Sequence, residues 1–166
     1  MRNFLFCVLY LSTISVASFI FGRFLPKAKF CFDRWPFHPF RFERDGQLYV
    51  AMGVRRWKDK CLDMSAIFPR LMASKKLPHE ISGEKLELMV QETCIAEWIP
   101  MLLALLGFGC IFIWKNVGGW AIALLYALGN LPYVIIQRYN RPKLVRLMKK
   151  YQERALNGGQ PQEILV

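Results

Sequence analysis

Two apolar runs joined by a short polar turn decide the fold of this 166-residue chain. The first is Trp98–Trp114 (WIPMLLALLGFGCIFIW), the turn is KNVGG at 115–119, and the second is Trp120–Gln137 (WAIALLYALGNLPYVIIQ). Each run is close to the roughly 17–25 residues that a helix needs to cross a hydrocarbon core about 30 Å thick. Tryptophan brackets the first run, as is typical of a membrane interface. The pattern predicts a transmembrane hairpin over 98–137.

A third apolar run, Asn3–Gly22, begins near the N-terminus and is followed by a basic, proline-containing segment. It is long enough to span a membrane, so residues 1–25 are expected to form an N-terminal transmembrane helix. The alternative is a signal peptide cleaved after Ser15-Val16-Ala17, although Arg2 alone makes a weak positive start. The predicted fold is a mainly α membrane protein with about three transmembrane helices, interfacial helices and a short β-hairpin.

The charge of the chain favours a membrane surface as its partner. There are 23 Lys and Arg against 12 Asp and Glu, a net charge of +11, yet 54% of the residues are hydrophobic. Such an apolar composition argues against a nucleic-acid partner, whereas anionic lipids attract each Lys or Arg near the surface by about 1 kcal/mol. Most of these cations lie in residues 23–97 and 138–166, and the hairpin turn holds Lys115. The distribution predicts a multi-pass protein of the cell membrane with its basic segments in the cytoplasm.

The cysteine and histidine content predicts neither a disulfide framework nor a metal site. The five cysteines are widely spaced, without a Cys-x-x-Cys pair, and there are two histidines. His38 and His79 are each followed five residues later by a glutamate, Glu43 and Glu84. This spacing loosely resembles the His-x4-Asp pair of glycerolipid acyltransferases, and chance is the better explanation.

The segment 26–97 is predicted to be a basic, aromatic layer at the membrane interface. Residues 30–40 alternate aromatic, charged and proline residues, which excludes a long helix. Residues 47–57, next to Gly46 and Gly53, are expected to form a short strand or hairpin. From Ser82 to Glu97, apolar spacing predicts an amphipathic helix that lies on the membrane. Residues 138–157 predict a second, basic surface helix, and 158–166 a disordered tail.

Residues 55–63 (RRWKDKCLD) are the first candidate site. One interpretation is a basic surface strip anchored by a tryptophan. The other is an anion site for phosphate or pyrophosphate, with Asp63 as a base or an orienting group. The residues proposed to bind substrate here are Arg56, Trp57, Lys58 and Lys60.

Glu97 is the second candidate, because it comes directly before an apolar span, where an acidic group is costly unless paired or used. It could act as general base toward a hydroxyl, or form a structural ion pair with Arg138 or Arg141. Glu92, five residues earlier, is a further catalytic candidate. The third candidate site is the polar end of the last span, which suggests a hydrogen-bonding pocket; its residues are Asn130, Gln137, Arg138, Tyr139, Asn140 and Arg141.

The sequence QRYNRPKL at 137–144, preceded by Asn130 and Pro132, closely resembles the glycosyl-4,4'-diaponeurosporenoate acyltransferase family. RWKDKCLD at 56–63 and ETCIAE at 92–97 also look like that family, in the same order, and the resemblance covers roughly residues 40–148. Members are small membrane proteins that attach a fatty acyl chain to the sugar of a glycosylated carotenoid, the last step to staphyloxanthin.

The resemblance implies O-acyl transfer from an activated donor, acyl-CoA or similar, to a hydroxyl of a glycolipid or carotenoid acceptor, with no bound cofactor. Glu97 or Asp63 would remove the hydroxyl proton. The cations that would hold a donor phosphate are Arg56, Lys58, Lys60, Arg138 and Arg141. Asn140 or an arginine would stabilise the oxyanion. Two alternatives remain at this point: a non-enzymatic membrane subunit or anionic-lipid scaffold, and a lipid-modifying enzyme of another reaction type.

Overall fold

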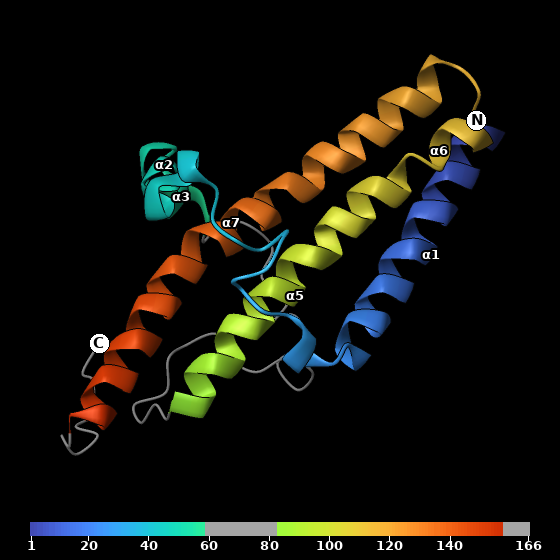
Figure 1. Cartoon of the computed structure of the whole chain (residues 1–166). Coiled ribbons are helices and arrows are strands. Elements are labelled where there is room, and N and C mark those ends of the chain that lie inside the picture. Colours follow the sequence, from blue (N-terminus) through green and yellow to red (C-terminus); the bar gives the residue numbers. More distant parts are fainter. Residues whose placement is uncertain (59–82, 158–166) are drawn as a thin grey trace.

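The computed structural model describes residues 1–58 and 83–157, and long helices packed side by side dominate this part of the chain (Figure 1). Helix α1 spans Arg2–Phe24, α5 spans Gly83–Gly107, the short α6 spans Cys110–Ile113, and α7 spans Val117–Leu156. Three helical stretches are long and apolar enough to cross a membrane: α1, residues 83–113 and α7. The expected mainly α membrane fold with three spans is confirmed.

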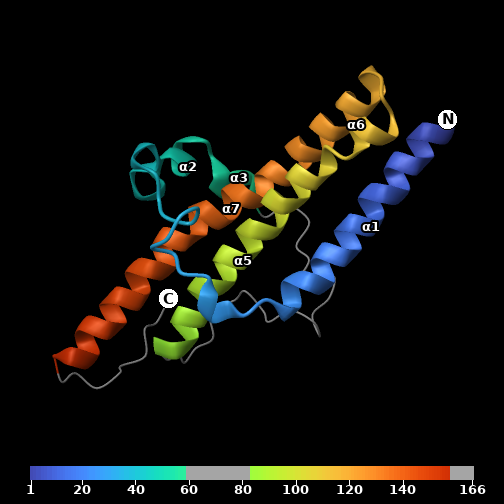
Figure 2. The same ribbon diagram turned by 45° about the vertical axis from the view of Figure 1, so that its right-hand side comes forward.

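Helices α5 and α7 run antiparallel and make the most extensive packing in the described residues, and α1 lies beside α5 (Figures 1 and 2). Near the turn, Cys7 of α1, Cys110 of α6 and Ala123 of α7 form a buried cluster. The Tyr10 hydroxyl donates to the Leu106 carbonyl oxygen at 2.8 Å, and the Ser15 and Tyr126 hydroxyls lie 2.8 Å apart. Helix α1 is therefore an integral part of the helical packing.

Both long helices continue past the boundaries expected from the sequence. Helix α5 passes through Pro100, and α7 passes through Pro132 and Pro142. The predicted helix of 82–97 thus continues without a break into the predicted span as far as Gly107, and α6 forms the end of that span; the last span and the basic helix of 138–157 are one helix, α7. Apolar side chains of the two helices pack against one another in one cluster: Leu86 and Val90 of α5 with Leu144, Leu147 and Met148 of α7.

The expected β-hairpin at 47–57 is corrected by the structure. Within residues 1–58 and 83–157 there are no strands, and this segment forms two short helices, α2 (Gln47–Ala51) and α3 (Val54–Trp57). Gly46 and Gly53 precede them with φ of 89° and 66°, a conformation that glycine adopts without steric cost. The two helical turns bring Tyr49 and Val54 into one cluster with Tyr139 of α7. Strand alternation would instead place residues 49 and 54 on opposite faces.

The aromatic segment before these helices runs from the end of α1 across α5 to the middle of α7 (Figure 1). It contains the 3-10 helices η1 (Lys27–Lys29) and η2 (Arg41–Gly46), and residues 31–40 between them are turns and extended backbone, as the prolines predicted. Phe37 is buried and packs edge-on against Trp98 of α5, with 6.4 Å between ring centroids. The segment therefore packs against protein along part of its length.

Candidate active site

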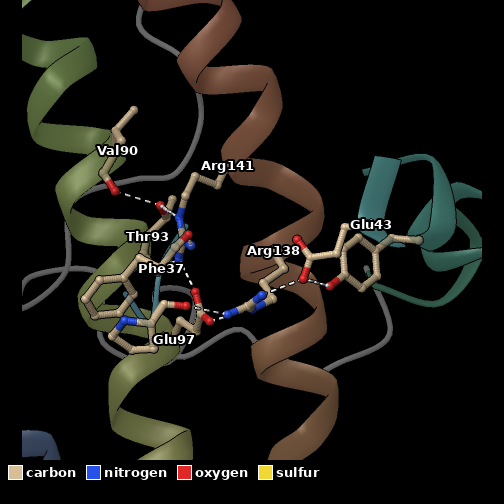
Figure 3. Close-up of polar contacts among 9 residues, drawn as sticks. Phe37, Glu43, Val90, Thr93, Glu97, Arg138 and Arg141 are labelled. Atoms are coloured by element: carbon tan, nitrogen blue, oxygen red, sulfur yellow. Dashed lines mark hydrogen bonds and ion pairs between the residues drawn. The ribbon is translucent and has the colours of Figure 1, made fainter. Parts of the chain in front are cut away.

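Four charged side chains meet where α5, α7 and η2 come together (Figure 3). Glu97 lies on α5, Arg138 and Arg141 lie on α7, and Glu43 lies on η2. Residues three apart on a helix share a face, so both arginines point toward α5. The four side chains, which we call the ion-pair network, are 0–9% exposed. Such burial requires that each charge be paired and hydrogen-bonded.

Glu97 is the centre of the ion-pair network. Its Oε1 accepts a hydrogen bond from Nε of Arg138 at 2.6 Å, and its Oε2 accepts one from Nη2 of Arg141. The side chain is fully buried. The structural alternative predicted for Glu97, an ion pair with Arg138 or Arg141, is therefore what the geometry favours, and it involves both arginines.

The two arginines also hold the aromatic segment and α5 through backbone carbonyls. Arg138 Nη2 donates to the Pro36 carbonyl at 2.7 Å, and Arg141 Nη1 donates to the Phe37 carbonyl at 2.9 Å. Arg141 further donates to Oγ1 and to the carbonyl oxygen of Thr93, both at 3.1 Å. Two arginines and two glutamates give the network a net charge of zero, and these hydrogen bonds offset part of the desolvation of the guanidinium groups.

Glu43 forms the second acidic member of the network. Its Oε1 accepts hydrogen bonds from Nη1 of Arg138 at 2.5 Å and from the Tyr49 hydroxyl at 2.8 Å. Burial raises the pKa of Tyr49 well above its usual value, and the hydrogen bond to Glu43 raises it further. Tyr49 therefore remains a neutral phenol, which donates its proton toward Glu43.

A groove of about 420 Å³ lies between α5 and α7 and ends at this network. Its polar end is formed by Glu43, Tyr49 and Arg138, and Asn130 lies on its wall. The rest of its lining is apolar: Phe40, Phe42, Pro100, Met101, Ala104, Ala127, Leu131 and Val134. The guanidinium of Arg138 lies 4.7 Å from the ring centroid of Phe40, so one cation faces both the groove and its aromatic wall. The groove thus joins an apolar slot to buried charges.

The predicted site residues on α5 and α7 lie in the groove lining, in the ion-pair network, or outside both. Arg138 and Asn130 line the groove. Glu97 and Arg141 lie behind it in the ion-pair network, while Gln137 is buried, Tyr139 is in the core and Asn140 is half-buried. The structure therefore brings Asn130 and Arg138 of the predicted third site to the groove, places Arg141 in the ion-pair network behind it, and leaves Gln137, Tyr139 and Asn140 outside both.

The other predicted residues lie outside the groove lining. Glu92 pairs with Lys27 at 2.7 Å in a half-exposed ion pair. Arg56 is exposed on α3, where Trp57 packs against the Tyr49–Tyr139 cluster and the Lys58 ammonium lies 5.9 Å from the Tyr139 ring centroid. Lys60 and Asp63 fall outside the described residues.

Glu43, Tyr49 and Thr93 are site residues that the sequence reasoning missed. Glu43 was noted for its spacing from His38, but His38 is exposed and Glu43 pairs with Arg138, 95 residues away. A signal did exist, because an acidic residue in a strongly aromatic segment needs a cationic partner once that segment is buried. Among the described residues, no cluster of His, Cys, Asp or Glu could hold a metal ion.

Fold and site together define a helical membrane protein with a neutral ion-pair network at the polar end of an apolar groove. Residues 33–150 match the model of the glycosyl-4,4'-diaponeurosporenoate acyltransferase family, so the chain belongs to this family of acyl-transferring enzymes.

The chain is similar to curated proteins named glycosyl-4,4'-diaponeurosporenoate acyltransferase from Staphylococcus aureus strains bovine RF122 / ET3-1, N315 and USA300. Each is 29% identical over 149 residues, which cover 87% of this chain and 87% of the relative. No solved structure matches the chain.

Proposed function

We propose that the protein is a membrane-bound O-acyltransferase that transfers a fatty acyl chain to a hydroxyl of a glycosylated carotenoid or a similar lipid-linked sugar. The observation that carries this proposal is the groove, whose apolar wall leads directly to Glu43, Tyr49 and Arg138. Its volume falls within the 300–1,000 Å³ that is typical of small-molecule sites. The names of the relatives supply the substrate class.

The position of the groove suits substrates that are dissolved in the bilayer. Met101, Ala104, Ala127 and Leu131 on its wall belong to the hairpin that the sequence places in the hydrocarbon region. An acyl or carotenoid chain would lie against these residues, and its polar end would reach Arg138. Arg138 is seven positions after Leu131, which is about 10 Å along a helix. The reacting groups would therefore meet close to the membrane interface.

The reaction joins the acceptor hydroxyl oxygen to the acyl carbonyl carbon and breaks the bond between that carbon and the donor's leaving group. Charge develops on the carbonyl oxygen as this happens, and a fixed cation aimed at it lowers the barrier. Arg138 is held by Glu43, Glu97 and the Pro36 carbonyl. It can supply that charge without reorganising during the reaction.

The donor is an activated acyl compound such as acyl-CoA, which enters as a co-substrate, with no bound cofactor. Two cations lie beside the Tyr139 ring: the ammonium of the exposed Lys143 on α7 is 3.7 Å from the ring centroid, and that of the half-buried Lys58, which follows α3, is 5.9 Å from it. We assign this basic surface, with Arg56, to the donor's phosphates and to anionic lipid. The assignment places the basic segments on the cytoplasmic side of the cell membrane, where acyl-CoA is available.

The test is to block the groove without changing the rest of the hairpin. Ala127→Phe places a ring in the groove, whereas Ala121→Phe, on the same helix, adds the same ring at an exposed position away from the lining. Membranes containing each variant are given a glycosylated carotenoid and radiolabelled acyl-CoA, and the ester product is separated by chromatography. Product should be lost with Ala127→Phe and retained with Ala121→Phe. Equal activity of the two variants would remove the groove from the reaction.

A further inference from the structure

On the basis of the proposed function, we propose that Glu43 is the general base that takes the proton of the acceptor hydroxyl, and that Tyr49 positions its carboxylate. Glu43 is the single carboxylate among the residues that line the described groove. It is 3% exposed, so its carboxylate is almost completely shielded from bulk solvent. A general base must lie within hydrogen-bond reach of the proton that it removes, and this place in the groove meets that condition.

The geometry assigns different roles to Glu43 and Glu97. Glu97 lies outside the groove lining and receives hydrogen bonds from both arginines on separate oxygens. The two described hydrogen bonds to Glu43, from Tyr49 and Arg138, converge on one oxygen, Oε1. Arg138 is anchored from behind by Glu97, so it keeps its place when Glu43 changes its protonation state. Glu97 is thus a positioning residue, and Glu43 is the group that faces substrate.

In the proposed step the acyl donor is a thioester. The acceptor hydroxyl oxygen attacks the carbonyl carbon and a C–O bond forms, while the hydroxyl proton moves to Glu43. The tetrahedral intermediate then collapses, the C–S bond breaks, and the leaving thiolate takes the proton back from Glu43. The ester and the free thiol leave, and Glu43 returns to its ionised, Arg138-paired state. Tyr49, a neutral donor, keeps Glu43 oriented throughout.

Two substitutions of Glu43 separate a base from a purely structural ion pair. Glu43→Gln removes the charge and the basicity but keeps the shape. Glu43→Asp keeps the negative charge near Arg138 but withdraws the carboxylate by one methylene from the groove, from Arg138 and from Tyr49. Glu87→Gln, an exposed glutamate on α5, is the matched control. Tyr49→Phe removes the hydroxyl alone.

The assay measures kcat and KM for the glycosylated carotenoid in reconstituted vesicles, per folded molecule. For a general base, Glu43→Gln should lower kcat by about 100-fold or more, and Glu43→Asp by about tenfold with KM unchanged. Tyr49→Phe should give a smaller loss, and Glu87→Gln none. Wild-type kcat in Glu43→Asp would overturn the base role and leave a structural charge pair. Wild-type protein that forms no ester at all would instead contradict the proposed function.

Discussion

Substitution of Glu97 by glutamine should destabilise the protein severely, because Glu97 is fully buried and pairs with two arginines. The amide keeps the shape of the carboxylate but removes its charge, so the network changes from neutral to a net charge of +1. Breaking a buried ion pair by removing one partner costs about 3–5 kcal/mol. For a chain of this size, 1 kcal/mol shifts the melting temperature by about 2–4 °C, so the expected fall is roughly 6–20 °C.

The chain carries its own probe for this measurement. Cys7, Cys94 and Cys110 are free and buried, so each becomes reactive toward a thiol-specific fluorescent dye when the helices separate. Detergent-solubilised protein is heated with the dye and its melting temperature is read from the fluorescence. Glu92→Gln is the matched control, because it removes the same charge from the same helix, but from a half-exposed pair with Lys27. Exposed pairs contribute less than about 1 kcal/mol. Equal melting temperatures for the two variants would refute the central structural role of Glu97.

Three further predictions concern packing, processing and topology. Gly119→Ala should destabilise the hairpin by about 1–3 kcal/mol, because a Cβ there would lie 2.1 Å from a backbone oxygen. Gly129→Ala has open space around it and should be neutral or stabilising. The melting temperatures of the two variants distinguish these outcomes. Since α1 contacts α5, α6 and α7 through Cys7, Tyr10 and Ser15, the protein isolated from membranes should have the mass of the uncleaved chain; a species that begins at residue 18 would contradict this. The topology can be tested with single cysteines in a chain without native cysteines. Lys115→Cys should react with a membrane-impermeant maleimide added outside the cell, and Lys150→Cys should react after permeabilisation. The reverse pattern would contradict the predicted orientation.

The number of helical spans could be predicted from the sequence because it depends on the length and polarity of local segments. The tryptophans at 98, 114 and 120 and the polar turn at 115–119 were sufficient for the hairpin. Helix continuity was harder to predict, because Pro100 and Pro132 usually interrupt a helix in water but are tolerated where neighbouring helices surround the backbone. The two short helices at 47–57 were missed because two glycines next to a β-branched and aromatic run also predict a hairpin.

About half of the candidate site could be predicted from the sequence. An acidic residue at the edge of a span requires a partner, and this reasoning led from Glu97 to Arg138 and Arg141, which do pair with it. Glu43 was missed because the sequence does not show that its aromatic segment is buried against α7, and only that burial creates the need for a partner such as Arg138, 95 positions away. The groove is also a tertiary feature, since its lining comes from η2, α2, α5 and α7.

The most direct test of the account is a transfer reaction with purified protein in vesicles that contain a glycosylated carotenoid and acyl-CoA. Mass spectrometry of the extracted lipid should reveal a carotenoid glycoside heavier by one acyl group less one hydrogen, in wild-type and Ala121→Phe vesicles and not with Ala127→Phe. An unchanged glycoside in wild-type vesicles, with folded protein present, would contradict the assignment of the groove to acyl transfer.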